Sequence, residues 1–189
     1  MLLGIDGNIL LWIQDNLRND FMTRFWKFIT SLGNLGTIWI IISLVLIFIP
    51  KTKKIGVMSG IALILSLIFI NIILKNMVAS PRPFTEIENL VCLVSKPREY
   101  SFPSGHASSS FASAVIFLKK LKKRYSIPLF LLAVMIAFSR LYIGVHYPTD
   151  VLCGAIFGTL IGFLAMWIYD KIDKKFVDKS TKSEEKVEA

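Results

Sequence analysis

The sequence has few charged residues and very few cysteines. Charged residues make up 19% of the 189 positions and hydrophobic residues 54%, which excludes an ordinary soluble domain and indicates a polytopic membrane protein. The two cysteines, Cys92 and Cys153, show no paired spacing, which argues against a disulfide and against a cysteine metal site. No basic recognition helix or aromatic platform occurs in a polar segment, so the net charge of +9 does not indicate nucleic-acid binding.

Residues 1–33 also lack a signal-peptide pattern, because Asp6 comes early, no basic region precedes it and no small-residue cleavage site follows. The segment is amphipathic, and Asp20 is placed to cap a helix in it. We expect this segment to lie in the lipid interface, with Trp12 and Trp26 as anchors. A short additional span is the alternative, although polar residues would interrupt it.

Apolar runs follow, and a bilayer core needs about 20 mostly apolar residues to cross it. Five runs predict spans, at about 34–49, 55–74, 104–118, 127–143 and 151–169. The third is rich in Ala and Ser, which predicts a helix packed inside the bundle. The expected fold is all-α, a membrane helical bundle of about five transmembrane helices over residues 34–170 with amphipathic N-terminal helices. Residues 171–189 are expected to form a basic, polar tail with a disordered end.

Positive charge gathers in three clusters, at residues 51–54, 119–124 and 171–175. With five spans, all three clusters lie on the same side of the membrane, and the positive-inside rule identifies that side as the cytoplasmic one. We therefore expect a multi-pass protein of the cell membrane with an extracytoplasmic N-terminus and a cytoplasmic C-terminus. The opposite, extracytoplasmic ends of the spans carry a set of polar residues that we treat as the candidate site: Lys75, Arg82, Ser104, Gly105, His106, Arg140, His146 and Asp150.

This set has the composition of a phosphate-binding site. Lys75, Arg82 and Arg140 supply three cations, and the start of a helix at Ser104 and Gly105 supplies free amide groups. Pro103 suits the first turn of that helix, and Gly105 would let an anion approach the backbone.

Both histidines of the chain belong to the same set. Asp150 follows His146 by four residues, so its carboxylate can fix the tautomer of an imidazole that attacks phosphorus. His106 can protonate the departing oxygen and later activate water. The acidic residues of the outer loop, Glu86, Glu88 and Glu99, are scattered, so we predict chemistry without a metal ion or other cofactor.

Three motifs contain these residues in chain order: Lys75-x6-Arg82-Pro83, Pro103-Ser104-Gly105-His106 and Ser139-Arg140-x5-His146-x3-Asp150. The sequence thereby resembles the type-2 phosphatidic-acid phosphatase superfamily, whose three signature motifs they match. The resemblance implies that residues 34–170 form a catalytic helical bundle. It also implies His146 as nucleophile, Asp150 as its orienting partner and His106 as general acid and then base. The phosphate-binding residues would be Lys75, Arg82, Ser104, Gly105 and Arg140.

The resemblance favours a lipid phosphate as substrate in the bilayer. Undecaprenyl diphosphate is the first expectation, with phosphatidylglycerophosphate and phosphatidic acid as alternatives, and no obligate protein partner is predicted. Lys96 and Arg98 either contact a second phosphate or are solvated loop charges. A lipid phosphotransferase would differ only in the attacking hydroxyl. A transporter is disfavoured, because its charges would lie nearer the middle of the spans.

Overall fold

The chain folds into helices throughout the part that the computed structural model describes, which is the backbone of residues 2–188 and the side chains of residues 4–175. In chain order the elements are α1 (Leu2–Leu17), α2 (Asp20–Leu32), η1 (Asn34–Gly36), α3 (Thr37–Phe48), α4 (Lys53–Ser66), η2 (Leu67–Leu74), α5 (Lys75–Val78), α6 (Pro83–Glu86), α7 (Gly105–Lys120), α8 (Lys123–Tyr142) and α9 (Pro148–Glu188). The predicted all-α class is confirmed.

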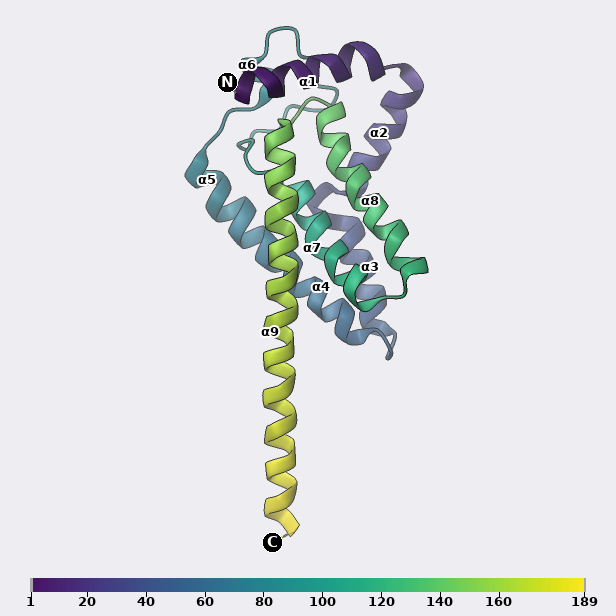
Figure 1. Cartoon of the computed structure of the whole chain (residues 1–189), viewed down its shortest axis with the longest axis vertical. Coiled ribbons are helices and arrows are strands. Elements are labelled where there is room, and N and C mark those ends of the chain that lie inside the picture. The colour runs from purple at the N-terminus through teal and green to yellow at the C-terminus, as the bar shows by residue number, and fades with distance from the viewer. Residues whose placement is uncertain (1, 189) are drawn as a thin grey trace.

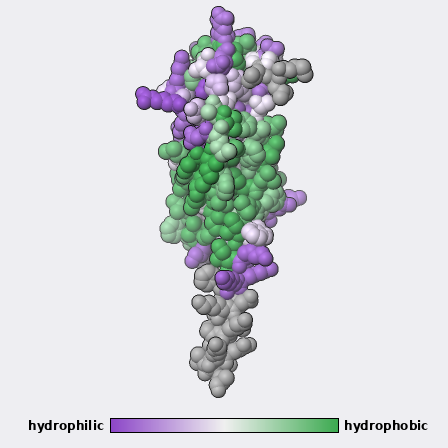
Figure 2. All heavy atoms as spheres, turned by 90° about the vertical axis from the view of Figure 1, so that its left-hand side faces the viewer, coloured by the Kyte–Doolittle hydropathy of each residue, from purple (hydrophilic) through white to green (hydrophobic). Residues whose placement is uncertain are grey.

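Three helical segments within the described residues are long and apolar enough to span a membrane: Lys53–Glu86, Lys123–Tyr142 and Pro148–Lys175. The pair Asp20–Leu32 and Asn34–Phe48, bent by 47°, forms a fourth candidate if it counts as one span. Figure 2 shows the apolar surface as a belt between two polar ends. The membrane bundle is thus confirmed, whereas the expected number of five spans is not.

Helix α7 lies inside the bundle, as its small residues predict. Its buried residues include Ala107, Ser108 and Ala112. Three glycines of α9, at positions 154, 158 and 162, face the backbone of α7, and a Cβ at Gly158 would lie 2.2 Å from the Ser108 carbonyl oxygen. Small residues on both helices allow this approach, which brings the start of α7 close to the start of α9.

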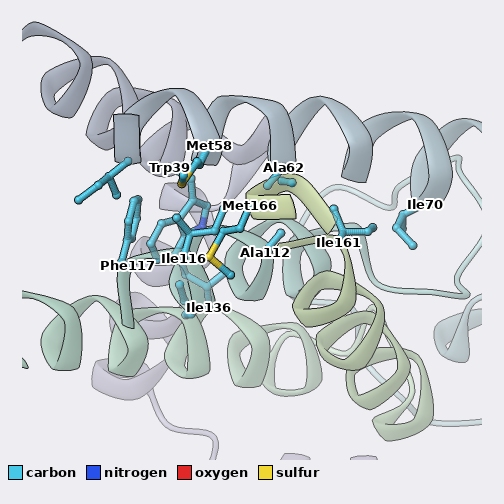
Figure 3. Packing of buried hydrophobic residues seen from close by; sticks show 14 of the residues in the cluster. Trp39, Met58, Ala62, Ile70, Ala112, Ile116, Phe117, Ile136, Ile161 and Met166 are labelled. Carbon is cyan, nitrogen blue, oxygen red and sulfur yellow. The ribbon is translucent and has the colours of Figure 1, made fainter. Parts of the chain in front are cut away.

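The core of the bundle combines large apolar side chains with paired hydroxyl groups. Figure 3 shows Trp39, Phe117 and Met166 among the buried residues that meet between the helices. The Trp39 indole donates a hydrogen bond of 2.9 Å to Ser110, and Ser59 donates one of 3.0 Å to Ser113. These pairs satisfy polar groups that have no water partner at membrane depth.

The N-terminal segment divides into two helices with different positions. Figure 1 shows α1 lying across the end of the bundle where α8 ends and α9 begins, whereas α2 runs beside α8. Asn19 caps α2 by accepting from the Met22 amide at 2.9 Å, so the expected cap at Asp20 was wrong by one residue. Trp26 packs against Phe138 of α8 with ring centroids 4.9 Å apart, and therefore contacts the bundle.

The two ends of the bundle differ in charge. The turns from α3 to α4 and from α7 to α8 lie at the end opposite α1 (Figure 1), and both carry basic clusters. A salt bridge of 2.6 Å between Lys54 and Asp173 joins the first cluster to the third, so these two share an end as predicted. Helix α9 continues to Glu188 across residues expected to form a disordered tail. Ala189 and the side chains of 176–189 lie outside the described residues.

Candidate active site

His146 lies in the short connection between α8 and α9, with 2% of its surface exposed. Its Nδ1 atom is 3.3 Å from Oδ2 of Asp150, one turn further along the chain, and its Nε2 atom is 3.1 Å from Nη1 of Arg82. A guanidinium group can only donate hydrogen bonds, so Nε2 carries the lone pair and Nδ1 carries the proton in this network. The predicted pairing of His146 with Asp150 is present.

The carboxylate of Asp150 is held by three donors. Its Oδ2 atom accepts from Nδ1 of His146, from the Tyr147 amide at 2.9 Å and from the Ser101 hydroxyl at 2.5 Å. Ser101 is fully buried, and its hydroxyl is also 3.4 Å from Nδ1 of His146. Nothing in the sequence marks Ser101, because its role depends on a contact with a residue 49 positions away.

The surroundings of His146 keep its imidazole neutral. Burial, which disfavours the charged ring, is the main reason why the pKa of His146 lies well below the usual value of 6.5. The cationic side chains of Arg82, Arg140 and Lys75 lower this pKa further. A neutral ring with its lone pair on Nε2 has the form that a nucleophile needs.

Lys75 and Arg82 reach the site from one side. Helix η2, a π-helix, directly precedes Lys75, whose side chain is buried. Such segments often occur at functional sites. The Lys75 ammonium is 3.0 Å from a carboxylate oxygen of Glu99. Arg82 donates from Nε to the Glu99 carbonyl at 2.8 Å and from Nη1 to the Val145 carbonyl at 2.9 Å. Glu99, which the sequence placed among scattered loop residues, thus contacts both cations.

Arg140 comes from the last turn of α8 and is nearly completely buried. Its Nη1 atom donates to the Thr30 hydroxyl of α2 at 2.7 Å. Its Nε atom is buried and has no hydrogen-bond partner among the described residues. A buried guanidinium donor without an acceptor favours an oxyanion ligand at this position.

The start of α7 differs in detail from the prediction. Ser104 is the N-cap, and its hydroxyl accepts from the Ala107 amide at 3.4 Å, so Pro103 lies before the first turn rather than in it. The Ser104 amide donates to the Asp150 carbonyl at 3.0 Å. A Cβ on Gly105 would lie 2.4 Å from Oδ1 of Asn71, so a larger residue here would require the Asn71 side chain of η2 to move.

His106 lies on the other side of the site. Its Nε2 atom is 3.2 Å from Oδ1 of Asn34, at the start of η1. A Cβ on Gly33 would lie 2.7 Å from the His106 ring, so the close contact between this ring and the turn before η1 requires a glycine. Hydrogen bonds link Lys75 to Arg82 through Glu99, and they link Arg82 to His146, His146 to Asp150 and Asp150 to Ser104 directly. His106 instead contacts Asn34 of η1, and Arg140 contacts Thr30 of α2.

The remaining candidates lie outside this arrangement. The Lys96 ammonium is 5.6 Å from the centre of the Phe84 ring, and both Lys96 and Arg98 are exposed. Cys92 and Cys153 are free thiols. In the part of the chain with described side chains, no three His, Cys, Asp or Glu residues form a group that could hold a metal ion.

Several known proteins are similar to this chain in sequence and in fold. Residues 56–174 match the model of the PAP2 superfamily. The chain is 34% identical to the undecaprenyl-diphosphatase of Sulfolobus acidocaldarius over 131 residues, which are 69% of this chain and 63% of that relative. It is 28% identical to the undecaprenyl-diphosphatase BcrC of Bacillus subtilis over 160 residues, 85% of this chain and 81% of that protein.

A similar solved structure is that of a transmembrane PAP2 type phosphatidylglycerolphosphate phosphatase from Bacillus subtilis, with a TM-score of 0.70 and 27% identity over 89% of this chain and 86% of that one. These relatives are named phosphatases that act on lipid phosphates, which is the enzyme class that the motifs predicted. The family match covers well over half of the chain and includes all three motifs. The chain therefore belongs to the PAP2 superfamily, the type-2 phosphatidic-acid phosphatases.

Proposed function

We propose that this protein is an integral-membrane phosphatase that hydrolyses undecaprenyl diphosphate to undecaprenyl phosphate through a phosphohistidine intermediate, without a metal ion. One observation carries the proposal. The buried His146 ring has its lone pair on Nε2, beside the Arg82 guanidinium, and its opposite nitrogen is held by Asp150. This is the geometry of a nitrogen nucleophile with an orienting carboxylate.

In the first step, Nε2 of His146 attacks the terminal phosphorus atom. The N–P bond forms as the bond from phosphorus to the bridging oxygen breaks, and His106 gives its proton to the departing undecaprenyl phosphate. Lys75, Arg82 and Arg140 stabilise the charge on the equatorial oxygens, together with Ser104 and Gly105 at the start of α7. Asp150 stabilises the positive ring that this step creates.

In the second step, water attacks the phosphorus atom of the phosphohistidine. His106, now neutral, accepts a proton from this water, and the N–P bond breaks. Inorganic phosphate leaves, and the neutral ring of His146 is restored, with the proton still on Nδ1 and hydrogen-bonded to Asp150. The cycle therefore returns both histidines to their starting protonation states.

The choice of lipid follows from the names of the relatives and from the expected position of the site. We place the protein in the plasma membrane, with the site on the extracytoplasmic face and the C-terminus in the cytoplasm, because the basic clusters lie at the opposite end of the bundle. Undecaprenyl diphosphate released outside the cell would reach such a site. Phosphatidylglycerophosphate is the second candidate, because the structure resembles a phosphatase for that lipid.

The test is phosphate release by the purified protein from undecaprenyl diphosphate, phosphatidylglycerophosphate and phosphatidic acid, measured side by side. We expect undecaprenyl diphosphate to lead by about a hundredfold in kcat/KM, which corresponds to about 3 kcal/mol of discrimination between transition states. The variant His146→Ala should release no phosphate, and a chelator should leave the activity unchanged. Loss of activity in chelator would contradict the metal-free mechanism, and activity in the variant would contradict the nucleophile.

A second phosphate on the lipid would need its own contacts. We expect Lys96→Ala and Arg98→Ala to impair hydrolysis of the diphosphate lipid more than hydrolysis of a monophosphate lipid. Equal effects on both lipids would show that these two residues are solvated charges of the outer loop.

A further inference from the structure

The Lys75–Glu99 pair joins a buried cation to an exposed anion. The Lys75 side chain has a relative exposure of 6%, whereas that of Glu99 has 72%. The ammonium group is therefore held in the site, and the carboxylate reaches it from the solvent side. An exposed carboxylate loses little when it leaves such a pair, because water replaces its partner.

The backbone around Glu99 is fixed, although its side chain is exposed. Its carbonyl oxygen accepts from Nε of Arg82, and the amide of Ser101 donates to the Ser80 carbonyl at 2.8 Å. The Ser101 hydroxyl, two residues beyond Glu99, bonds Asp150. The segment 99–101 is therefore tied to the catalytic residues, so Glu99 can release Lys75 by rotation of its side chain alone.

The distribution of charge in the site indicates what the Lys75–Glu99 ion pair does. Lys75, Arg82 and Arg140 form the cationic set, and among the described residues Glu99 is the one carboxylate within ion-pair distance of any of them. The Lys75 ammonium has three N–H donors, but a phosphate group bound beside Glu99 would place two negative groups on one ammonium, and their repulsion favours release of the carboxylate. The pKa of Glu99 is lowered, chiefly by its hydrogen bond to Lys75, so the carboxylate is charged and competes at neutral pH.

We infer that Glu99 is a counter-ion that Lys75 exchanges for the phosphate of the substrate, and that it sets the affinity of the site for phosphate. The inference rests on the proposed function, since it gives a role to a residue of that same site. Glu99 leaves Lys75 when the substrate binds and returns when inorganic phosphate departs. It thereby weakens the binding of the product as well as that of the substrate.

The experiment measures the dissociation constant for inorganic phosphate by calorimetry on the full-length protein in detergent. Glu99→Gln keeps the shape of the side chain and removes its charge. We expect the dissociation constant to fall by about threefold to tenfold, the size of one partly exposed ion pair. Glu88→Gln is the matched control: it makes the same change in an exposed residue of the same loop that has no ion pair in the structure, and it should leave the constant unchanged.

A double-mutant cycle with Lys75→Gln shows whether the effect acts through the ammonium. In the Lys75→Gln background, Glu99→Gln should bring no further gain in affinity. An unchanged or weaker affinity in Glu99→Gln alone would overturn the inference, and so would an equal gain in Glu88→Gln. Failure of the proposed function would be seen separately, as no hydrolysis of any lipid by the unsubstituted protein, because the phosphate titration uses no lipid.

Discussion

Ser101 gives the sharpest test of how the proposed nucleophile, His146, is held. The substitution Ser101→Ala removes one of the three donors to Oδ2 of Asp150 and leaves those from His146 and the Tyr147 amide. A hydrogen bond to a charged group contributes about 1.5–3 kcal/mol. In the proposed mechanism, the attack on phosphorus makes the His146 ring positive, so the position of the carboxylate matters most in the transition state. We therefore expect kcat to fall by roughly tenfold to a hundredfold.

The division between kcat and KM distinguishes this role from a general loss of structure. The Ser101 hydroxyl bonds Asp150 and His146 and makes no hydrogen bond to Lys75 or Arg140, so the KM of Ser101→Ala should stay within about twofold of the original value. The matched control is Ser113→Ala, which removes an equally buried hydroxyl that accepts from Ser59, within the bundle core. Both variants should lose similar thermal stability, but only Ser101→Ala should lose kcat. A kcat within twofold of the original would refute this account of Ser101.

Three further results are expected. Gly158→Ala should lower the melting temperature, because its Cβ would lie 2.2 Å from the Ser108 carbonyl oxygen and overpacking costs about 1–3 kcal/mol. Gly60→Ala, which has open space around it, is the control and should be neutral. Equal melting temperatures of the two variants would contradict the close packing of α7 on α9. In nitrogen NMR spectra of the His106→Ala variant, which has one histidine left, the ring of His146 should stay neutral at pH 6, because its pKa is lowered; a protonated ring there would be contrary evidence. Between pH 6.5 and this lowered pKa, His146 binds a proton in the unfolded chain but not in the folded chain. Stability therefore falls as the pH falls through this window, and acid denaturation should begin there. His146→Gln should make stability less dependent on pH in the same window.

Much of the fold could be predicted because its signals are local. The apolar runs at 34–49 and 127–143 correspond closely to η1–α3 and α8, since burial in lipid requires continuous apolar sequence. The small residues at 104–118 predicted the interior position of α7 in the same way. The position of α2 could not be predicted, because its amphipathic pattern fits a lipid interface as well as packing against α8.

The sequence by itself determined the chemical inventory of the site: two histidines, three cations and Asp150, at spacings that match three motifs. The i, i+4 pairing of His146 with Asp150 is local, and so it was visible in advance. Only the tertiary structure decided that the Ser101 hydroxyl donates a hydrogen bond to Asp150 and that Glu99 forms an ion pair with Lys75. These contacts close loops of tens of residues, and their partners are set by the path of the chain between the helices rather than by any spacing along it.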